Sequence, residues 1–135
     1  MTPLKPLLSD LSRAAIPPIV VVALQATRMS LLPGALSFDI LMHFLGGAAI
    51  AWSAMIVYRR WEARGWIHAD AIVRDYAVWM TAVFVGVIWE WWEFWMERWT
   101  HRIYQLSMGD TMQDLFMDTI GALFLVLVYR LRKKK

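Results

Sequence analysis

Seven of the eleven acidic residues in this sequence fall, with one histidine, in or beside three apolar segments. These eight residues are Asp39, His43, Glu90, Glu93, Glu97, Asp110, Asp114 and Asp118. At about 100° per residue, the members of each segment share one helical face. Packed carboxylates repel one another, so they need either bound protons or a bound cation. The spacing therefore predicts a metal site or a protonatable site built from three helices.

The donor types favour a hard or borderline metal ion. Carboxylate oxygens with one imidazole and no thiolate suit Mn²⁺, Mg²⁺, Fe²⁺ or Zn²⁺, and the chain has no cysteine at all. The helical rise of about 1.5 Å per residue puts the deeper members at one level. We predict that a divalent metal is bound by His43, Glu93, Asp114 and Asp118. Glu90 is the candidate second ligand or general base, and hence the predicted catalytic residue.

Four further residues form the predicted rim of this site: Asp39, Glu97, Asp110 and Arg28. Asp110 also suits a helix cap, and Arg28 suits a counter-charge, an anion anchor or a side chain that snorkels to the interface. Two interpretations of the deeper residues need no metal. They could form a structural hydrogen-bond network or a protonatable pathway.

The elements that must position these residues are membrane-spanning helices. The 135-residue chain is 59% hydrophobic and 19% charged, which is too apolar for a soluble monomer or a disordered chain. Stretches of about 20 apolar residues, long enough to cross a bilayer, occupy 14–32, 38–58, 76–96 and 112–131. The sequence predicts an all-α protein with a single domain over 1–135, an integral membrane bundle of four transmembrane helices. Pro17 and Pro18 should start or kink the first.

Charge sets the predicted orientation. Eleven of the 14 basic residues lie before the first span, between the second and third, or in the C-terminal tail. By the positive-inside rule both termini are cytoplasmic, and the acidic cluster faces outward from a bacterial-type inner (cytoplasmic) membrane. The basic tail predicts contact with anionic membrane lipids. No pattern for binding nucleic acid is present.

Small and aromatic residues indicate how the spans face one another. Gly46, Gly86 and Gly121 each continue an acidic face toward the membrane centre, where small residues let helices approach closely. The faces that carry the acids should therefore point into the bundle. The tryptophans around Glu90 lie on other faces and suit an aromatic belt at the outer interface.

The motifs of the last three spans resemble a known family. They are Phe38-Asp39-x3-His43-Phe44-x-Gly46-Gly47, Trp89-Glu90-x2-Glu93 and the run GDTMQDLFMDTIGA that starts at Gly109. Over about residues 38–122 the chain resembles the YjdF-like small membrane proteins, which are similar to the VanZ-like superfamily. The resemblance implies a four-helix membrane protein and supports the site more than any particular activity.

The leading functional hypothesis is metal-dependent hydrolysis of a polar lipid or envelope precursor, with Glu90 accepting a proton from metal-bound water. An accessory subunit that packs within a larger membrane complex, or a homo-oligomer, is the first alternative. Ion or proton transport through the acidic cluster is the second. Against transport, the cytoplasmic halves of the spans hold no matching polar residues.

Overall fold

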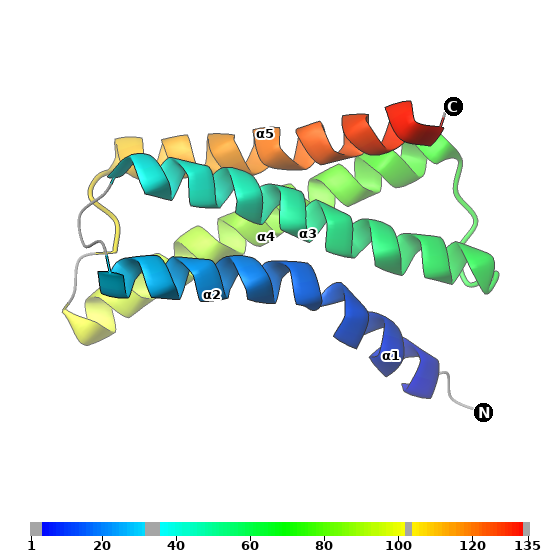
Figure 1. Cartoon of the computed structure of the whole chain (residues 1–135), viewed down its shortest axis with the longest axis horizontal. Coiled ribbons are helices and arrows are strands. Elements are labelled where there is room, and N and C mark those ends of the chain that lie inside the picture. The colour runs from blue at the N-terminus through cyan, green and yellow to red at the C-terminus, as the bar shows by residue number, and fades with distance from the viewer. Residues whose placement is uncertain (1–3, 32–35, 102–103, 134–135) are drawn as a thin grey trace.

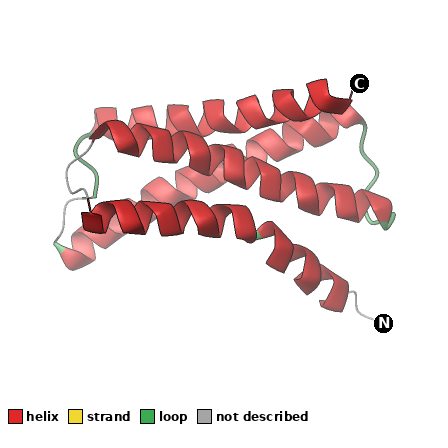
Figure 2. Cartoon of the chain, in the orientation of Figure 1, coloured by secondary structure: helices red, strands yellow, loops and turns green. Residues whose placement is uncertain are grey.

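The protein is an all-α bundle in which long helices run roughly along one axis (Figure 1). The computed structural model describes residues 4–31, 36–101 and 104–133. Over that part of the chain it contains helices and connections and no strand (Figure 2). The helices are α1 (Leu4–Ala14), α2 (Ile16–Leu31), α3 (Leu36–Ala63), α4 (Ala71–Thr100) and α5 (Met108–Lys133). The expectation of an all-helical fold is confirmed.

The first predicted span differs from expectation because the helix begins earlier. Helix α1 precedes it, and α1 and α2 meet at an angle beside Ala15 (Figure 1). Pro17 and Pro18 have no amide hydrogen, so the carbonyls of Arg13 and Ala14 lose their usual helical donors. The chain still keeps hydrogen bonds on both sides of the break, from Ala15 N to Leu11 O at 2.9 Å and from Ile19 N to Ala15 O at 3.1 Å. The two prolines therefore kink the helical segment between α1 and α2 and do not start it, since α1 already begins at Leu4.

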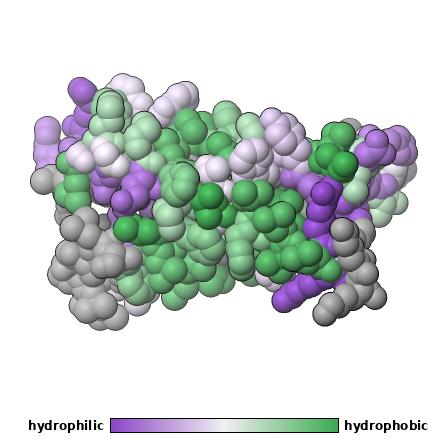
Figure 3. All heavy atoms as spheres, turned by 90° about the horizontal axis from the view of Figure 1, so that it is seen from above, coloured by the Kyte–Doolittle hydropathy of each residue, from purple (hydrophilic) through white to green (hydrophobic). Residues whose placement is uncertain are grey.

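Three helical stretches among the described residues are long and apolar enough to cross a membrane. They are Pro6–Thr27, Phe38–Ala63 and Ala71–Thr100. The space-filling view agrees with a membrane setting, since an apolar middle separates more hydrophilic ends on the face shown (Figure 3). A fourth crossing by α5 remains a prediction.

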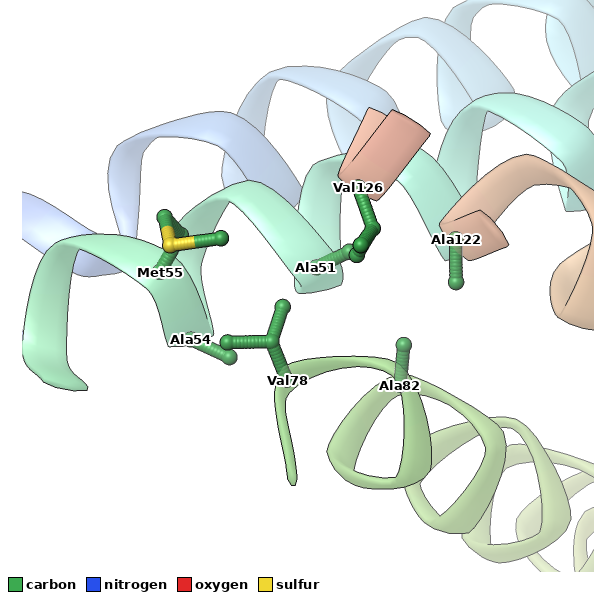
Figure 4. Close-up of a cluster of buried hydrophobic side chains, with 7 residues drawn as sticks. All are labelled: Ala51, Ala54, Met55, Val78, Ala82, Ala122 and Val126. Atoms are coloured by element: carbon green, nitrogen blue, oxygen red, sulfur yellow. The ribbon is translucent and has the colours of Figure 1, made fainter. Parts of the chain in front are cut away.

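Helices α3, α4 and α5 pack around a small apolar core (Figure 4). Its members are mostly short side chains: Ala51, Ala54, Met55, Val78, Ala82, Ala122 and Val126. Two glycines explain why α3 and α5 lie so close. A Cβ on Gly47 would fall 2.0 Å from the carbonyl oxygen of Asp118, and one on Gly121 would fall 2.0 Å from that of Phe44. Backbone thus contacts backbone at the crossing, as expected of small residues in lipid.

The end of the bundle that holds α1, the 64–70 connection and the C-terminal end of α5 carries paired charges (Figure 1). Asp10 is fully buried and accepts hydrogen bonds from Arg60, at 2.8 Å, and from Arg64. The bond with Asp10 raises the pKa of the Arg64 guanidinium above its ordinary value. Helix α1 and the C-terminal end of α5 thus lie at the same end of the bundle (Figure 1). Which side of the membrane this end faces remains a prediction.

A second set of ion pairs lies at the same end. Asp75 accepts a hydrogen bond from Arg130 Nε at 2.7 Å and one from Arg74 Nη2 at 3.3 Å. Arg74 also reaches both carboxylate oxygens of Glu62 at 3.3 Å. We call these contacts, together with those of Asp10, the paired end. Asp10 lies 50 residues from Arg60 in the sequence and Asp75 lies 55 residues from Arg130, so no local pattern predicts these pairs.

Candidate metal centre

The opposite end of the bundle gathers the predicted site residues from three helices. Helix α3 carries Asp39 and His43, α4 carries Glu90 and Glu93, and α5 carries Asp114 and Asp118. Four of them are buried: His43, Glu90, Asp114 and Asp118. A buried carboxylate is costly unless it is paired, hydrogen-bonded or neutralised. This end, which we call the acidic end, therefore requires an explanation for its charge.

His43 lies between two aspartates of α5. Its Nδ1 lies 3.4 Å from Asp118 Oδ2, and its Nε2 lies 3.8 Å from Asp114 Oδ2. The i, i+4 spacing of the aspartates places one on either side of the imidazole, because side chains four apart share a helical face. A single histidine thus faces two carboxylates, so one imidazolium could compensate at most one of their charges.

Three donors form a compact group. Asp39, His43 and Asp114 each offer one ligand atom, and these atoms all lie within 4.8 Å of one another. Two ligands on opposite sides of a small divalent ion stand about 4.2 Å apart, given bonds of about 2.1 Å. Modest side-chain rotations would therefore bring the three donors onto one ion. Asp39, expected at the rim, belongs to this group, whereas Glu93 and Asp118, expected as ligands, do not.

Asp118 lies in a recess made by glycines. Its carboxylate oxygens would be 3.6 Å from a Cβ on Gly46 and 2.8 Å from one on Gly86. The missing side chains leave room for a carboxylate between α3, α4 and α5, in the part of the bundle where the backbones approach most closely. The prediction that Gly46, Gly86 and Gly121 face inward is therefore confirmed.

Two glutamines complete the surroundings of the acids. Gln25 of α2 donates from Nε2 to Asp39 Oδ1 at 3.0 Å, and its buried Oε1 has no partner among the described residues. Gln105, in the connection before α5, donates to Glu90 Oε2 at 2.8 Å and to the Glu90 carbonyl at 3.1 Å. Gln105 was missed from the sequence, since a glutamine in a connection carries no periodic signal.

Glu90 keeps one buried oxygen unpaired. Its side chain is 4% exposed, and Oε1 has no hydrogen-bond partner within the described part of the chain. Glu90 also lines an open cavity of about 750 Å³ between the end of α4 and the start of α5, together with Glu97 and Gln105. A carboxylate that a hydrogen bond from Gln105 holds in place beside a cavity is the arrangement expected of a proton acceptor.

The remaining predicted residues, Glu93, Glu97 and Asp110, accept hydrogen bonds from residues close to them in the chain. Glu93 accepts a hydrogen bond from Trp89 Nε1 at 2.9 Å, one turn away on α4. Glu97 accepts from the backbone amides of Tyr104 and Gln105, at 3.3 and 3.2 Å, and so holds the connection to α5. Asp110 lies in the first turn of α5 and accepts from Leu106 N at 3.0 Å, while its own amide donates to Ser107 Oγ at 3.2 Å, so the two side chains together satisfy amides at the start of α5. The side chain of Arg28 lies outside the described residues.

The aromatic residues of α4 behave as the sequence indicated. Four tryptophans in the last third of this helix are exposed: Trp91, Trp92, Trp95 and Trp99. Trp89 differs, because its indole points to Glu93 and is partly buried. The exposed indoles suit the interfacial belt of a membrane protein.

The geometry thus defines a membrane helical bundle with a buried carboxylate and histidine cluster at one end. Over residues 25–135 the chain matches the model of the family of predicted membrane proteins DUF2238, and it belongs to that family. The matched region begins within α2 and includes every residue of the compact group. No curated protein and no solved structure matches the chain. The resemblance to YjdF-like and VanZ-like proteins therefore remains a prediction.

Proposed function

We propose that this protein binds a divalent cation within the membrane through Asp39, His43 and Asp114. The observation that carries the proposal is the compact group itself: three donors from two helices whose ligand atoms lie within 4.8 Å of one another. One histidine with two carboxylates is a donor set common to Mn²⁺, Fe²⁺ and Zn²⁺ sites, with open positions left for water or substrate. Mg²⁺ would also accept the carboxylates but prefers more oxygen donors.

Asp118 serves this centre by orienting the histidine. If the Nδ1–H of His43 donates to Asp118, the lone pair of Nε2 is left for the cation on the side of Asp114. Histidine ligands in proteins usually donate their other nitrogen to a carboxylate in this way, which fixes the tautomer. In this proposal Asp118 accepts a hydrogen bond from the ligand His43 and does not bind the cation itself. The proposed ligands are therefore Asp39, His43 and Asp114.

The reaction that fits such a centre is hydrolysis of a polar lipid or envelope precursor. Asp39, His43 and Asp114 would hold the cation, which would supply Lewis-acid activation of water when bound. Glu90 would accept the proton of the attacking water and would return it to the departing oxygen of the substrate. Burial of the acids supports this role, because electrostatic interactions strengthen where water is excluded.

Transport and an accessory role are the two alternatives. For transport, the described residues between the acidic end and the paired end form an apolar core without a matching polar path. An accessory role in a larger complex, or assembly into a homo-oligomer, stays a prediction.

Cation titration tests the proposal. Purified protein should be stripped with a chelator and titrated separately with Mn²⁺, Zn²⁺ and Mg²⁺, with bound metal counted by elemental analysis. We expect about one ion per chain, lost in His43→Ala and in Asp114→Asn. Asp110→Asn is the matched control, since Asp110 lies one turn away on the same helix and accepts a hydrogen bond from Leu106 N. Equal binding by the wild type and the Asp114→Asn variant would contradict the proposal.

A further inference from the structure

A cavity on the membrane-facing side of the bundle leads to the acidic end. It has a volume of about 180 Å³ and lies among α2, α3 and α4. Most of its wall is apolar, formed by residues such as Val21, Ile50 and Val85, while Gln25, His43 and Asp118 also line it. The cavity therefore changes from apolar to polar along its wall.

The packing of α2 explains why this cavity opens sideways. Helix α2 packs against α1 and α3, and within the described residues its backbone makes no close contact with α4 or α5. Side chains on the neighbouring outer faces of α2 and α4 are apolar and exposed, among them Ile19 and Phe84. In a chain of this family, such surfaces face the acyl chains of lipids. Lipid is thus the neighbour at the opening between α2 and α4.

The polar part of the wall has an unmet hydrogen-bond requirement. Gln25 lines the cavity, and its buried Oε1 accepts no hydrogen bond from the described residues, while its Nε2 is used by Asp39. A buried acceptor without a donor is destabilising, because it has lost its hydrogen bond to water and gained none in return. A ligand with a hydroxyl or ammonium donor next to an apolar chain would satisfy both parts of the wall at once.

We propose that this cavity holds one acyl chain of a membrane phospholipid, with the polar head of the lipid directed to the acidic end. The inference rests on the proposed function, since it names the substrate class of that centre. Gly46, Gly47 and Gly86 line the cavity, and Asp118 occupies the space left by their missing side chains, so its carboxylate reaches the polar part of the wall. The head group then lies next to His43, and its donor reaches Gln25.

The test uses the full-length protein in nanodiscs of phosphatidylethanolamine that contain a photoactivatable phosphatidylethanolamine with the reactive group on one acyl chain. After illumination, labelled peptides are mapped by mass spectrometry. We expect labelling to concentrate at cavity residues of α2 and α4, such as Val21 and Val85. Labelling spread evenly over exposed residues such as Ile19 and Phe84 would overturn the proposal.

A pair of variants gives a second measurement. Val21→Trp fills the cavity, and we expect it to lower cavity labelling several-fold. Val20→Trp is the matched control, because Val20 is the exposed neighbour and does not line the cavity. Equal labelling of the two variants would also overturn the lipid proposal.

The same samples separate this proposal from cation binding. Asp114→Asn should lose the cation and keep the lipid label, whereas Val21→Trp should lose the label and keep the cation. A wild type that binds the cation but shows no preferred labelling removes the lipid proposal alone. A wild type labelled in the cavity without binding a cation leaves the lipid site standing and removes the metal centre.

Discussion

The two ends of this bundle bury carboxylates in similar apolar surroundings but compensate their charge in opposite ways. At the paired end, Asp10 and Asp75 each contact two arginines. At the acidic end, the described side chains offer the imidazole of His43 to Asp114 and Asp118, and glutamine amides to Asp39 and Glu90. Neutral amides orient a carboxylate without cancelling its charge.

The difference lies in how the described side chains balance the buried negative charge at each end. The negative charge of a buried carboxylate that is paired with a guanidinium is already balanced, so binding a further ion would add little stability. Carboxylates that share one imidazole still lack positive charge, so protons or a cation must supply it. An apolar core of α3, α4 and α5 side chains lies between the two ends. Variants at the two ends should therefore respond differently to charge removal and to added metal.

The largest effect is expected at the paired end. Asp75→Ala leaves Arg74, which is 6% exposed, without one of its two acidic partners, and it removes the contact of Arg130. Breaking a buried ion pair costs about 3 kcal/mol. The free energy of unfolding, measured by chemical denaturation in detergent, should fall by about that amount. Asp70→Ala is the control, because Asp70 is exposed and its side chain makes no capping hydrogen bond.

The acidic end should respond to metal instead. A cation that binds only the folded state adds about 2.7 kcal/mol to the free energy of unfolding at 100 times its dissociation constant. We expect this gain in the wild type and none in Asp114→Asn. In chelator the variant should be no less stable than the wild type, because it loses one of several like charges. A marked loss of stability in chelator would mean that Asp114 is already compensated.

The contact that joins α3 to α5 beside the acidic end should give the next largest effect. Gly47→Ala places a methyl group against the carbonyl of Asp118, so the helices must separate. Overpacking of this kind costs about 2 kcal/mol, measurable in the same unfolding assay, and it should also weaken cation binding. Gly109→Ala is the matched control, since Gly109 is exposed and a methyl group there meets only Ser107 Oγ at 3.5 Å.

The smallest effect is expected at the lipid-facing surface of the acidic end. Trp95 is 53% exposed, and Trp95→Leu should change the free energy of unfolding by less than about 0.5 kcal/mol. Trp89→Leu removes the hydrogen bond to Glu93 and should cost about 1 kcal/mol. Similar values for the two variants would show that the Trp89 bond contributes no more than a lipid contact.

Much of the acidic end could be predicted from helical spacing. The i, i+4 and i, i+3 patterns place Asp114 and Asp118 on one face and Glu90 on another inward face, and the structure buries all three. The ligand set itself stays a prediction, since spacing along a helix fixes angle and depth but not how far apart two helices lie. The compact group joins two of the predicted ligands, His43 and Asp114, to Asp39, which the spacing placed at the rim.

The sequence by itself determined that the helices lie in a membrane and which face of each helix carries the acidic residues. Its apolar content and helical periodicity specify a helical membrane protein with acids on inward faces, because burial in lipid depends on residue type and on spacing within one helix. Tertiary structure alone decided which charges meet. The pairing of Asp10 with Arg64 and the glycine contacts that bring α3 to α5 both depend on segments distant in the chain. Electrostatic compensation depends on distances of a few ångströms between helices, which no local pattern encodes.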